Sequence, residues 1–194
     1  MRTRVIDPDG FEAKFQQDID PWNYANSPFE AHKRGVLLRA VGSRHFGRGL
    51  ELACAIGETT RFLAPRCLRL LALDSSDTAL GEAKRRTGSL QNVALCRAIL
   101  PLDLPNGPFD LIVASEILYY LRANDLRSLL ARIVHATAPG GRVVILHHLR
   151  NFDDAAIPPS MAQGWAGRHL RRSMKLVFRH DDARFQALAL VKCR

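Results

Sequence analysis

An α/β fold with a doubly wound, mostly parallel sheet of seven strands is predicted by three features of this sequence. From residue 49 onward, short apolar runs alternate with helical segments, the pattern of parallel sheets covered by helices on both faces. The runs 68–73 and 109–115 are apolar along most of their length, as expected for strands buried on both faces. The last two β-like runs, 174–179 and 185–191, are joined by a tight segment, which permits only an antiparallel hairpin.

The residues before the sheet are expected to form an irregular arm followed by one helix. Turn-forming residues recur along the chain up to Tyr24, so this stretch is predicted to be irregular. The helix is predicted to begin at Pro28, with Ser27 as its N-cap and Glu30 closing a capping box. Its apolar face is expected to consist of Val36, Leu37, Ala40 and Val41.

The sheet and its helices follow from the same local signals. Parallel strands are expected at 49–53, 68–73, 93–96, 109–115 and 142–147. Helices are expected at 60–67, at 76–86 and from Asn124 to Pro139-Gly140-Gly141. Ser75 or Ser76 is available to cap the second of these helices, and Asn124 is the expected cap of the third.

The strongly basic composition raises the question of a nucleic-acid partner. The formal net charge is +9, and a basic surface is the electrostatic requirement for binding phosphates. Lys and Arg are nevertheless spread along the whole chain, and no aromatic residues are interleaved with the densest cluster as a base-stacking platform would require. That cluster consists of Arg168, Arg171, Arg172 and Lys175. A basic solvated face is therefore favoured, and nucleic-acid binding stays an alternative.

Membrane and metal partners are not expected. No stretch has the apolar length needed to cross a bilayer, and the first residues lack the apolar core of a secretory signal. A cytoplasmic location is the resulting expectation. The four cysteines are widely separated, with no CxxC pair, so no metal site is predicted.

The loop after the first strand carries the first candidate site. In a dinucleotide-binding G-x-G-x-x-G register, the third small residue would fall at Glu58, whose carboxylate would repel a pyrophosphate. Read as acidic-x-G-x-G-x-G, the loop has Glu51 as the acid and small residues at Ala53, Ala55 and Gly57. This register resembles motif I of the S-adenosylmethionine methyltransferases, which implies a Rossmann-like fold and a loop that packs against the methionine part of that cofactor.

An acidic residue at the end of the second strand is the next candidate. Asp74, followed by Ser75, ends the run 68–73, where a carboxylate can accept hydrogen bonds from both ribose hydroxyls of a nucleoside. The alternative is a helix N-cap, but the adjacent serines can cap equally well. The same resemblance implies that the loop after the third strand borders the adenine. No acid stands at 97–99, so backbone groups of Ala98 and Ile99 are expected to serve there, with Asp103 as a substitute.

A carboxylate and two phenols follow directly on the fourth strand and mark the expected reaction centre. Glu116 stands at the mouth of a core strand, where a buried carboxylate needs a partner. Tyr119 and Tyr120 are expected either to contact the substrate or to pack. His147 and His148 end the fifth strand, and because neighbouring strand residues point to opposite faces, one of them at most can enter the same site.

Several segments together resemble the nodulation protein S family over roughly residues 18–147. They are DPWNYANSPFEAHKR (residues 20–34), ELACAIG, LDSS, FDLIVASEILYYL and APGGRVVI. Members of that family are methyltransferases that place a methyl group on the amine of a deacetylated, glucosamine-containing oligosaccharide. The resemblance implies S-adenosylmethionine as cofactor, S-adenosylhomocysteine as product and a small-molecule amine or amino sugar as acceptor.

The resemblance also implies roles for the candidate residues. Glu116 or one of the two histidines, His147 being the first candidate, is expected to bind or deprotonate the acceptor ammonium, with Tyr119 beside it. The cofactor is expected to contact Glu116 as well. Trp22 is expected either to lie in a segment that folds over the cofactor or to anchor the N-terminal arm.

The chain is expected to form a single methyltransferase domain in three parts. Residues 1–45 are an N-terminal arm and capping helix, 46–147 the cofactor-binding core, and 148–194 an acceptor-side helix and the C-terminal hairpin. Two alternatives stay open. One is an RNA or protein methyltransferase that uses the basic surface. The other is a non-catalytic binding module with this fold, which is supported by alanine in place of glycine at positions 53 and 55. Both a monomer and a homodimer are compatible with the sequence.

Overall fold

Seven strands form one sheet in the computed structural model, which describes residues 5–193. The strands are β1 (Phe46–Leu52), β2 (Cys67–Asp74), β3 (Val93–Arg97), β4 (Phe109–Ser115), β5 (Thr137–His148), β6 (Met174–Asp181) and β7 (Phe185–Lys192). The α-helices are α1 (Pro8–Gln17), α2 (Pro28–Val41), α3 (Thr60–Leu63), α4 (Asp77–Thr87), α5 (Ala123–Ala136) and α6 (Pro159–Leu170). Two 3₁₀ turns, η1 (Ala64–Arg66) and η2 (Leu118–Tyr120), complete the described elements.

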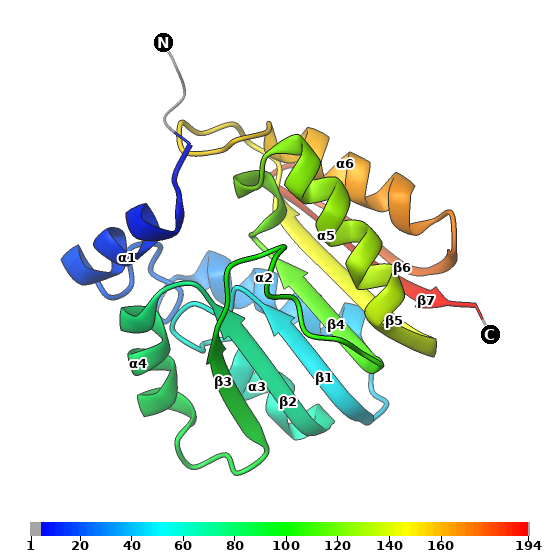
Figure 1. Cartoon of the computed structure of the whole chain (residues 1–194), viewed down its shortest axis with the longest axis horizontal. Helices are drawn as coiled ribbons and strands as arrows, with labels where there is room; N and C mark the ends of the chain where they lie inside the picture. The colour runs from blue at the N-terminus through cyan, green and yellow to red at the C-terminus, as the bar shows by residue number, and fades with distance from the viewer. Residues whose placement is uncertain (1–4, 194) are drawn as a thin grey trace.

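The strand order confirms the predicted fold class. Across the sheet the order is β3-β2-β1-β4-β5-β7-β6 (Figure 1). Strands β1 to β5 pair in parallel, whereas β7 pairs antiparallel with both β5 and β6. The chain leads outward from β1 to β3 and then returns to place β4 on the other side of β1. At such a reversal the two loops leave the sheet in opposite directions and open a crevice at the carboxyl ends of the strands.

Two apolar layers cover the two faces of the sheet. Along β4, the alternate residues Leu111 and Val113 pack with α2 and α3, whereas Ile112 and Ala114 pack with α5 and α6. This alternation follows from the opposite directions of successive side chains on a strand. All four are 0% exposed, so β4 is buried on both faces as its apolar sequence predicts. The predicted apolar face of α2 is likewise confirmed as buried: Val36, Leu37, Ala40 and Val41.

The prediction of an irregular arm before Tyr24 is wrong, because α1 lies within it. The Asp7 carboxylate caps this helix by accepting from the amide of Gly10 at 2.8 Å, and Pro8 occupies the first helical position. Phe11 and Phe15 stand four residues apart on one face. The capping signal was therefore in the sequence, but two aromatic residues in one short helix gave too little periodicity to outweigh the neighbouring turn formers.

The predicted capping of α2 is partly wrong, and the predicted cap of α5 is wrong. Ser27 does accept from the amide of Glu30 at 3.4 Å, but the Glu30 carboxylate does not close a capping box, because it accepts from Lys33 at 3.0 Å instead. In α5 the N-cap is Arg122 rather than Asn124. The Asn124 side chain accepts from an arginine one turn further on, at 3.1 Å.

Several predicted element boundaries also differ from the structure, most clearly those of one helix and one strand. The helix predicted at 60–67 is split into α3 and η1, and Cys67 already belongs to β2. Strand β5 begins at Thr137, five residues before the predicted start, and runs through the Pro-Gly-Gly segment. Gly140 has φ 73°, and the pairing register with β4 shifts between Phe109 and Leu111, so an irregularity of the strand absorbs the turn-forming residues.

Helix α1 is held against the rest of the molecule by polar contacts at two of its residues. The Glu12 carboxylate accepts from the hydroxyl of Ser76 at 2.6 Å and from the amide of Thr78 at 3.2 Å. It therefore adds to the N-terminal cap of α4. Lys14 forms an ion pair with Asp154 at 2.6 Å. In Figure 1, α1 consequently lies beside the start of α4 at the end of the sheet. None of the helices among residues 5–193 has the length and apolarity to cross a membrane.

Replacing Glu12 by alanine is expected to loosen α1 without loosening the sheet. Hydrogen bonds from Ser76 and Thr78 lower the pKa of Glu12 to about 2. Because this folded pKa lies below the ordinary value of 4.5, the anchoring is complete above that value and is lost as the pH falls toward 2. Amide hydrogen exchange measures both effects: the protection factors of the α1 amides should fall in the variant at pH 7, and in the parent only at acid pH.

The matched control is Asp9→Ala, which removes an exposed carboxyl from the first turn of the same helix. Its α1 amides should exchange nearly as in the parent. Equal protection of α1 in Glu12→Ala and in the parent would contradict the anchoring role.

Candidate functional site

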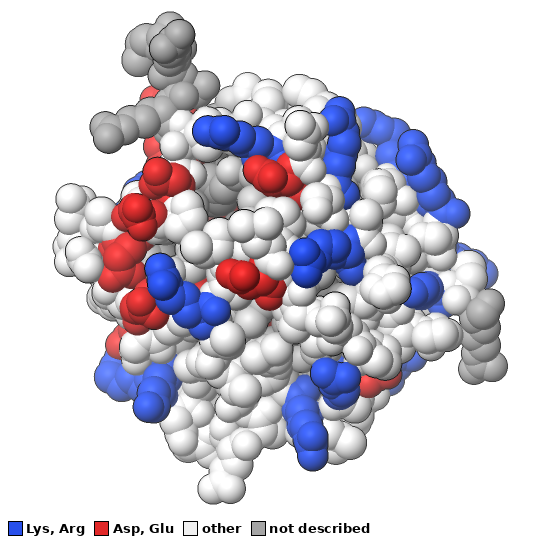
Figure 2. Space-filling view, viewed as in Figure 1, with Lys and Arg blue, Asp and Glu red and all other residues white. Residues whose placement is uncertain are grey.

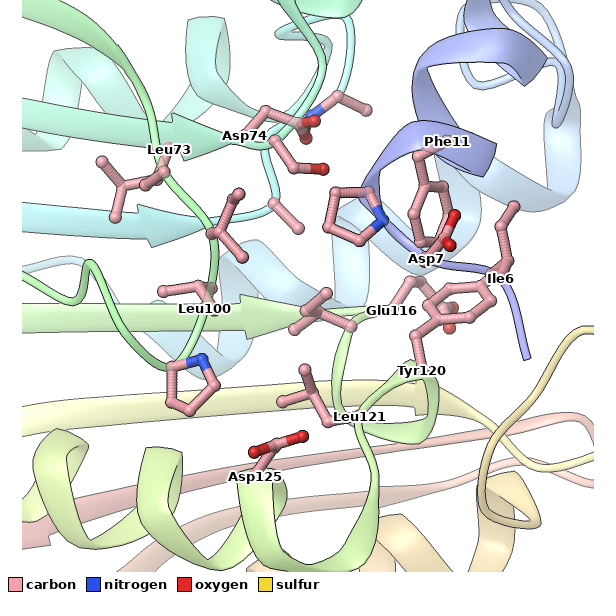
Figure 3. A pocket seen from close by; sticks show the side chains of 18 of the residues that line it. Ile6, Asp7, Phe11, Leu73, Asp74, Leu100, Glu116, Tyr120, Leu121 and Asp125 are labelled. Carbon is pink, nitrogen blue, oxygen red and sulfur yellow. Dashed lines mark hydrogen bonds between the residues drawn. The ribbon is translucent and has the colours of Figure 1, made fainter.

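A cavity of about 430 Å³ opens at the carboxyl ends of β1, β2 and β4 (Figure 3). It lies at the crevice created by the reversal of strand order, where open α/β sheets hold ligands, and its size suits a small molecule. Its wall combines the loop after β1, the end of β2, the loop after β3, the segment after β4 and the inner face of α1. Of the predicted cofactor residues, eight line it: Trp22, Ala53, Ala55, Asp74, Ser75, Ala98, Ile99 and Glu116.

The loop after β1 has a backbone that normally requires glycine. Ala53, Ala55 and Gly57 have φ angles of 55°, 48° and 76°, all in the left-handed region, which costs an alanine about 1–2 kcal/mol. At Gly57 a Cβ atom would stand 3.0 Å from the Cα of Ala83 in α4, so this position packs the loop against a helix rather than lining the cavity. The small residues at 53, 55 and 57 thus all allow the left-handed backbone conformation of the loop.

Asp74 joins the loop after β1 to the end of β2. One carboxylate oxygen accepts from the amide of Ala55 at 2.8 Å and the other from the amide of Ser76 at 3.0 Å. The N-cap of α4 is Ser76, which accepts from the amide of Ala79 at 3.0 Å, so Asp74 is not needed as a cap. Burial raises the pKa of Asp74, partly offset by its backbone hydrogen bonds. Each carboxylate oxygen keeps acceptor capacity for a ligand.

The amides of the loop after β3 are already engaged within the protein. The amide of Ala98 donates to the carbonyl of Asp74 at 2.8 Å, and the amide of Ile99 donates to the carboxylate of Asp103 at 2.8 Å. Asp103 is exposed and does not line the cavity. Contacts to a ligand at this wall are therefore left to side chains and carbonyl oxygens.

Glu116 is a nearly buried carboxylate held by three partners on the wall of the cavity (Figure 3). Its Oε2 accepts from the hydroxyl of Tyr119 at 2.6 Å and from the amide of His148 at 3.0 Å. Its Oε1 forms an ion pair with Lys33 of α2. Burial would raise the pKa of Glu116, but the attraction of Lys33 and these hydrogen bonds outweigh it and lower the pKa below the ordinary value. Its φ of 56° is a further strained backbone angle at this edge of the sheet.

Of the other predicted reaction-centre residues, Tyr119 and His147 do not line the cavity. Tyr119 is 4% exposed and supports Glu116, whereas Tyr120 lines the cavity. His147 is 0% exposed: its Nε2 accepts from the amide of Leu118 at 3.2 Å, and its Nδ1 lies 2.7 Å from the side-chain oxygen of Gln163. Burial lowers the pKa of His147 to about 4, so it is neutral near pH 7 and both ring nitrogens face protein groups.

Of the remaining predicted site residues, Trp22 lies among aromatic side chains and Glu51 lies outside the large cavity. Trp22 lines the cavity and also packs against Phe15 and Tyr24, with ring centroids 5.5 and 5.6 Å apart, so both roles predicted for it are compatible with its position. Glu51 lies behind the loop in a separate cavity of about 50 Å³. Burial raises the pKa of Glu51 to about 8, which keeps its carboxyl group protonated at neutral pH.

Sequence reasoning missed the contributions of α1, α2 and α5. Phe11 and Phe15 bring aromatic rings to the cavity from α1, and Asp125 lines it from the first turn of α5 (Figure 3). Lys33 was not singled out because nothing in its local sequence shows that α2 passes behind β4. The Asp7-Pro8 cap was the one local signal for α1. Among residues 5–193, no three His, Cys, Asp or Glu side chains are grouped to hold a metal ion.

The curated proteins include several relatives of this chain, which spans little more than half of their length. A nodulation protein S from Rhizobium tropici is 32% identical over 127 residues, covering 64% of this chain and 53% of that protein. A nodulation protein S from Bradyrhizobium diazoefficiens is 34% identical over 124 residues, covering 62% of this chain and 58% of that protein. The family resemblance of the sequence is thereby confirmed.

Solved structures agree with the sequence matches. The N-methyltransferase NodS from Bradyrhizobium japonicum WM9, in complex with S-adenosyl-l-homocysteine, superposes with a TM-score of 0.80 at 26% identity, covering 94% of this chain and 98% of that chain. A second structure of that NodS protein gives a TM-score of 0.72, covering 87% of this chain and 99% of that chain. The family model for nodulation protein S (NodS) matches residues 9–151, and the chain therefore belongs to the nodulation protein S family.

Proposed function

We propose that this chain is an S-adenosylmethionine-dependent methyltransferase that transfers a methyl group to the nitrogen of a small-molecule amine. The observation that carries the proposal is the pair of carboxylates, Asp74 and Glu116, on the wall of one cavity at the carboxyl edge of the sheet. Family membership supports the same chemistry, because a NodS structure is described as an N-methyltransferase in complex with S-adenosyl-l-homocysteine.

The lining of the cavity fits the parts of the cofactor. Asp74 has acceptor capacity for the ribose hydroxyls, with Ser75 beside it. The left-handed loop at Ala53 and Ala55 lets its backbone approach the methionine part closely. The apolar side chain of Ile99, in the loop after β3, suits the faces of an adenine ring. S-adenosylhomocysteine would be the product.

The residues of the chain bind and orient the acceptor rather than forming a covalent bond with it. S-adenosylmethionine supplies a methyl group on a sulfonium; the C–N bond forms as the S–C bond breaks, and sulfur keeps the electron pair. Glu116 stays ionised and attracts the acceptor as an ammonium, which must release one proton to water before the lone pair of its nitrogen can attack the methyl carbon. His147 is proposed to hold the segment after β4 through Leu118 rather than to take that proton. Trp22 and Tyr120 add aromatic surface to the lining of the cavity.

An amino sugar is the acceptor class that we propose. The cavity is lined by the carboxyl groups of Asp7, Asp74, Glu116 and Asp125 and by one arginine, Arg122, which favours a cationic acceptor. The aromatic faces of Trp22 and Tyr120 suit the apolar face of a sugar ring. These carboxylates would repel the phosphates of RNA. On the visible face of the molecule, Lys and Arg are scattered and Asp and Glu gather near α1 and α4 (Figure 2).

The test of the proposed function is methyl transfer from labelled S-adenosylmethionine to a panel of amino sugars, glucosamine oligosaccharides, other amines, tRNA and protein. Transfer to an amine or amino sugar is expected, with little loss of acceptor affinity at high salt. Transfer to tRNA alone, with affinity that falls steeply with salt, would replace the proposal. Saturable cofactor binding without transfer to any acceptor would favour a binding module.

Replacing Asp74 by alanine is expected to weaken cofactor binding. The loss of charge-assisted hydrogen bonds to two hydroxyls should reduce the binding free energy of S-adenosylhomocysteine by about 1.5–3 kcal/mol, as measured by calorimetric titration. Asp77→Ala is the matched control, since that carboxyl is exposed in the first turn of α4, and its affinity should equal that of the parent. Unchanged affinity in Asp74→Ala would show that the ribose lies elsewhere.

Replacing Glu116 by glutamine is expected to reduce turnover more than cofactor affinity. The amide keeps the size of the side chain but loses the charge that attracts an ammonium, so kcat/KM for the amine should fall by about tenfold to a hundredfold. Steady-state kinetics and titration with S-adenosylhomocysteine separate the two effects. Glu82→Gln, which changes a carboxylate paired with arginines on α4, serves as the control. Parent-like turnover in Glu116→Gln would remove this residue from the reaction centre.

A further inference from the structure

A buried lysine links Glu116 to helix α2. Lys33 is 5% exposed and lies between two carboxylates: Glu30, one turn earlier on α2, at 3.0 Å, and Glu116, which follows β4. Lys33 does not line the large cavity but the small one behind the loop after β1, and Glu116 lines both. The lysine therefore reaches Glu116 from the side away from the proposed substrate.

We propose that Lys33 is a positioning residue, which holds the Glu116 carboxylate as a fixed anion for binding the acceptor ammonium. This inference rests on the proposed function. Lys33 touches neither acceptor nor cofactor in this arrangement, and it acts through Glu116 alone.

The hydrogen bonds around Glu116 explain why a third partner is needed. Tyr119 and the amide of His148 both donate to Oε2, which fills the two lone pairs of that oxygen. Lys33 pairs with Oε1, an atom that is itself buried. The carboxylate plane is thus fixed by contacts to both oxygens, and its negative charge stays at the wall of the large cavity that Glu116 lines.

The charges of the cluster favour an incoming cation. Glu30 and Glu116 share the ammonium of Lys33, and Arg34 is a further cation close to Glu30. An acceptor ammonium would add a second cation beside Glu116, whose charge Lys33 neutralises only in part while it also pairs with Glu30. Burial lowers the pKa of Lys33, but the attraction of Glu116 and Glu30 outweighs this effect and raises it. The charged state of the pair therefore persists in its buried setting.

Other titratable groups also face Glu116 and must be included in any pH argument. His147 and His148 approach from β5, Tyr119 and Tyr120 from η2, and Tyr24 from the segment before α2. Burial lowers the pKa values of both histidines and raises those of the three tyrosines. All five are therefore neutral around pH 7, and Lys33 is the cation in direct contact with Glu116.

The test compares Lys33→Met with Lys33→Arg in the full chain. Without the ammonium, Glu116 should take up a proton at higher pH, so the acid limb of the pH profile of kcat/KM for the amine should move up by about 1–3 pH units. Below the shifted limb, kcat/KM of the methionine variant should fall about tenfold for each further pH unit, whereas at pH 7 the loss should be about threefold at most. Arginine should restore the parent limb, and affinity for S-adenosylhomocysteine should be unchanged in both.

Glu30→Gln is the matched control within the cluster. This variant removes the second carboxylate that contacts Lys33 but keeps the ion pair between Lys33 and Glu116. The acid limb of its kcat/KM profile should therefore stay at the parent position or move to lower pH. A parent-like limb in a Lys33→Met variant that still binds S-adenosylhomocysteine would overturn the proposal. A limb that moves up equally in the arginine variant would overturn it as well.

A carboxyl titration keeps the proposal testable if the methionine variant fails to fold. Carbon-13 NMR of glutamate-labelled parent protein, with Glu116→Gln used to assign the resonance, should show Glu116 ionised throughout the range from pH 7 to its ordinary pKa. A Glu116 pKa at or above the ordinary value of 4.5 would overturn the inference. A parent that methylates no amine would overturn the proposed function instead, and the same titration of the parent and of Lys33→Arg would still show whether a cation at position 33 keeps Glu116 charged.

Discussion

The reversal of strand order between β1 and β4 is the constraint on which the rest of this structure depends. Since β4 returns to the other side of β1, the loops after these strands diverge and leave a cavity between them. Ala53 and Ala55 lie on one side of this opening and Glu116 on the other. The strained backbone angles of all three residues stand at this edge, where surrounding contacts hold conformations that an isolated chain would avoid.

The hydrogen bonds of the site connect separate elements rather than neighbours in sequence. Asp74 ties the loop after β1 to the end of β2 through the amide of Ala55. Glu116 ties the segment after β4 to α2 through Lys33 and to β5 through the amide of His148. Each carboxylate therefore stabilises the wall that it lines. This double use explains how a site at the ends of strands can keep a fixed shape although it is built from loops.

Local chemistry was sufficient to predict the sheet and part of the cavity wall. Buried strands such as β4 show apolar runs, and the residue that follows a parallel strand must lie at the carboxyl edge; these two rules placed Asp74 and Glu116. Lys33 could not be placed in the same way, because its contact with Glu116 joins residues 83 apart in the sequence. The orientations of Tyr119 and His147 depend on η2 and α6, whose packing no local pattern reveals.

The contrast between the exterior and the cavity has a consequence for how a substrate arrives. The chain carries a formal net charge of +9, whereas carboxyl groups predominate in the lining of the cavity. At physiological ionic strength charges are screened beyond about 8 Å, so a cation approaching through solvent is not drawn in from afar. It is attracted only on reaching the mouth. Selection between ligands is therefore made by contact within the cavity, and diffusion toward the protein contributes little to it.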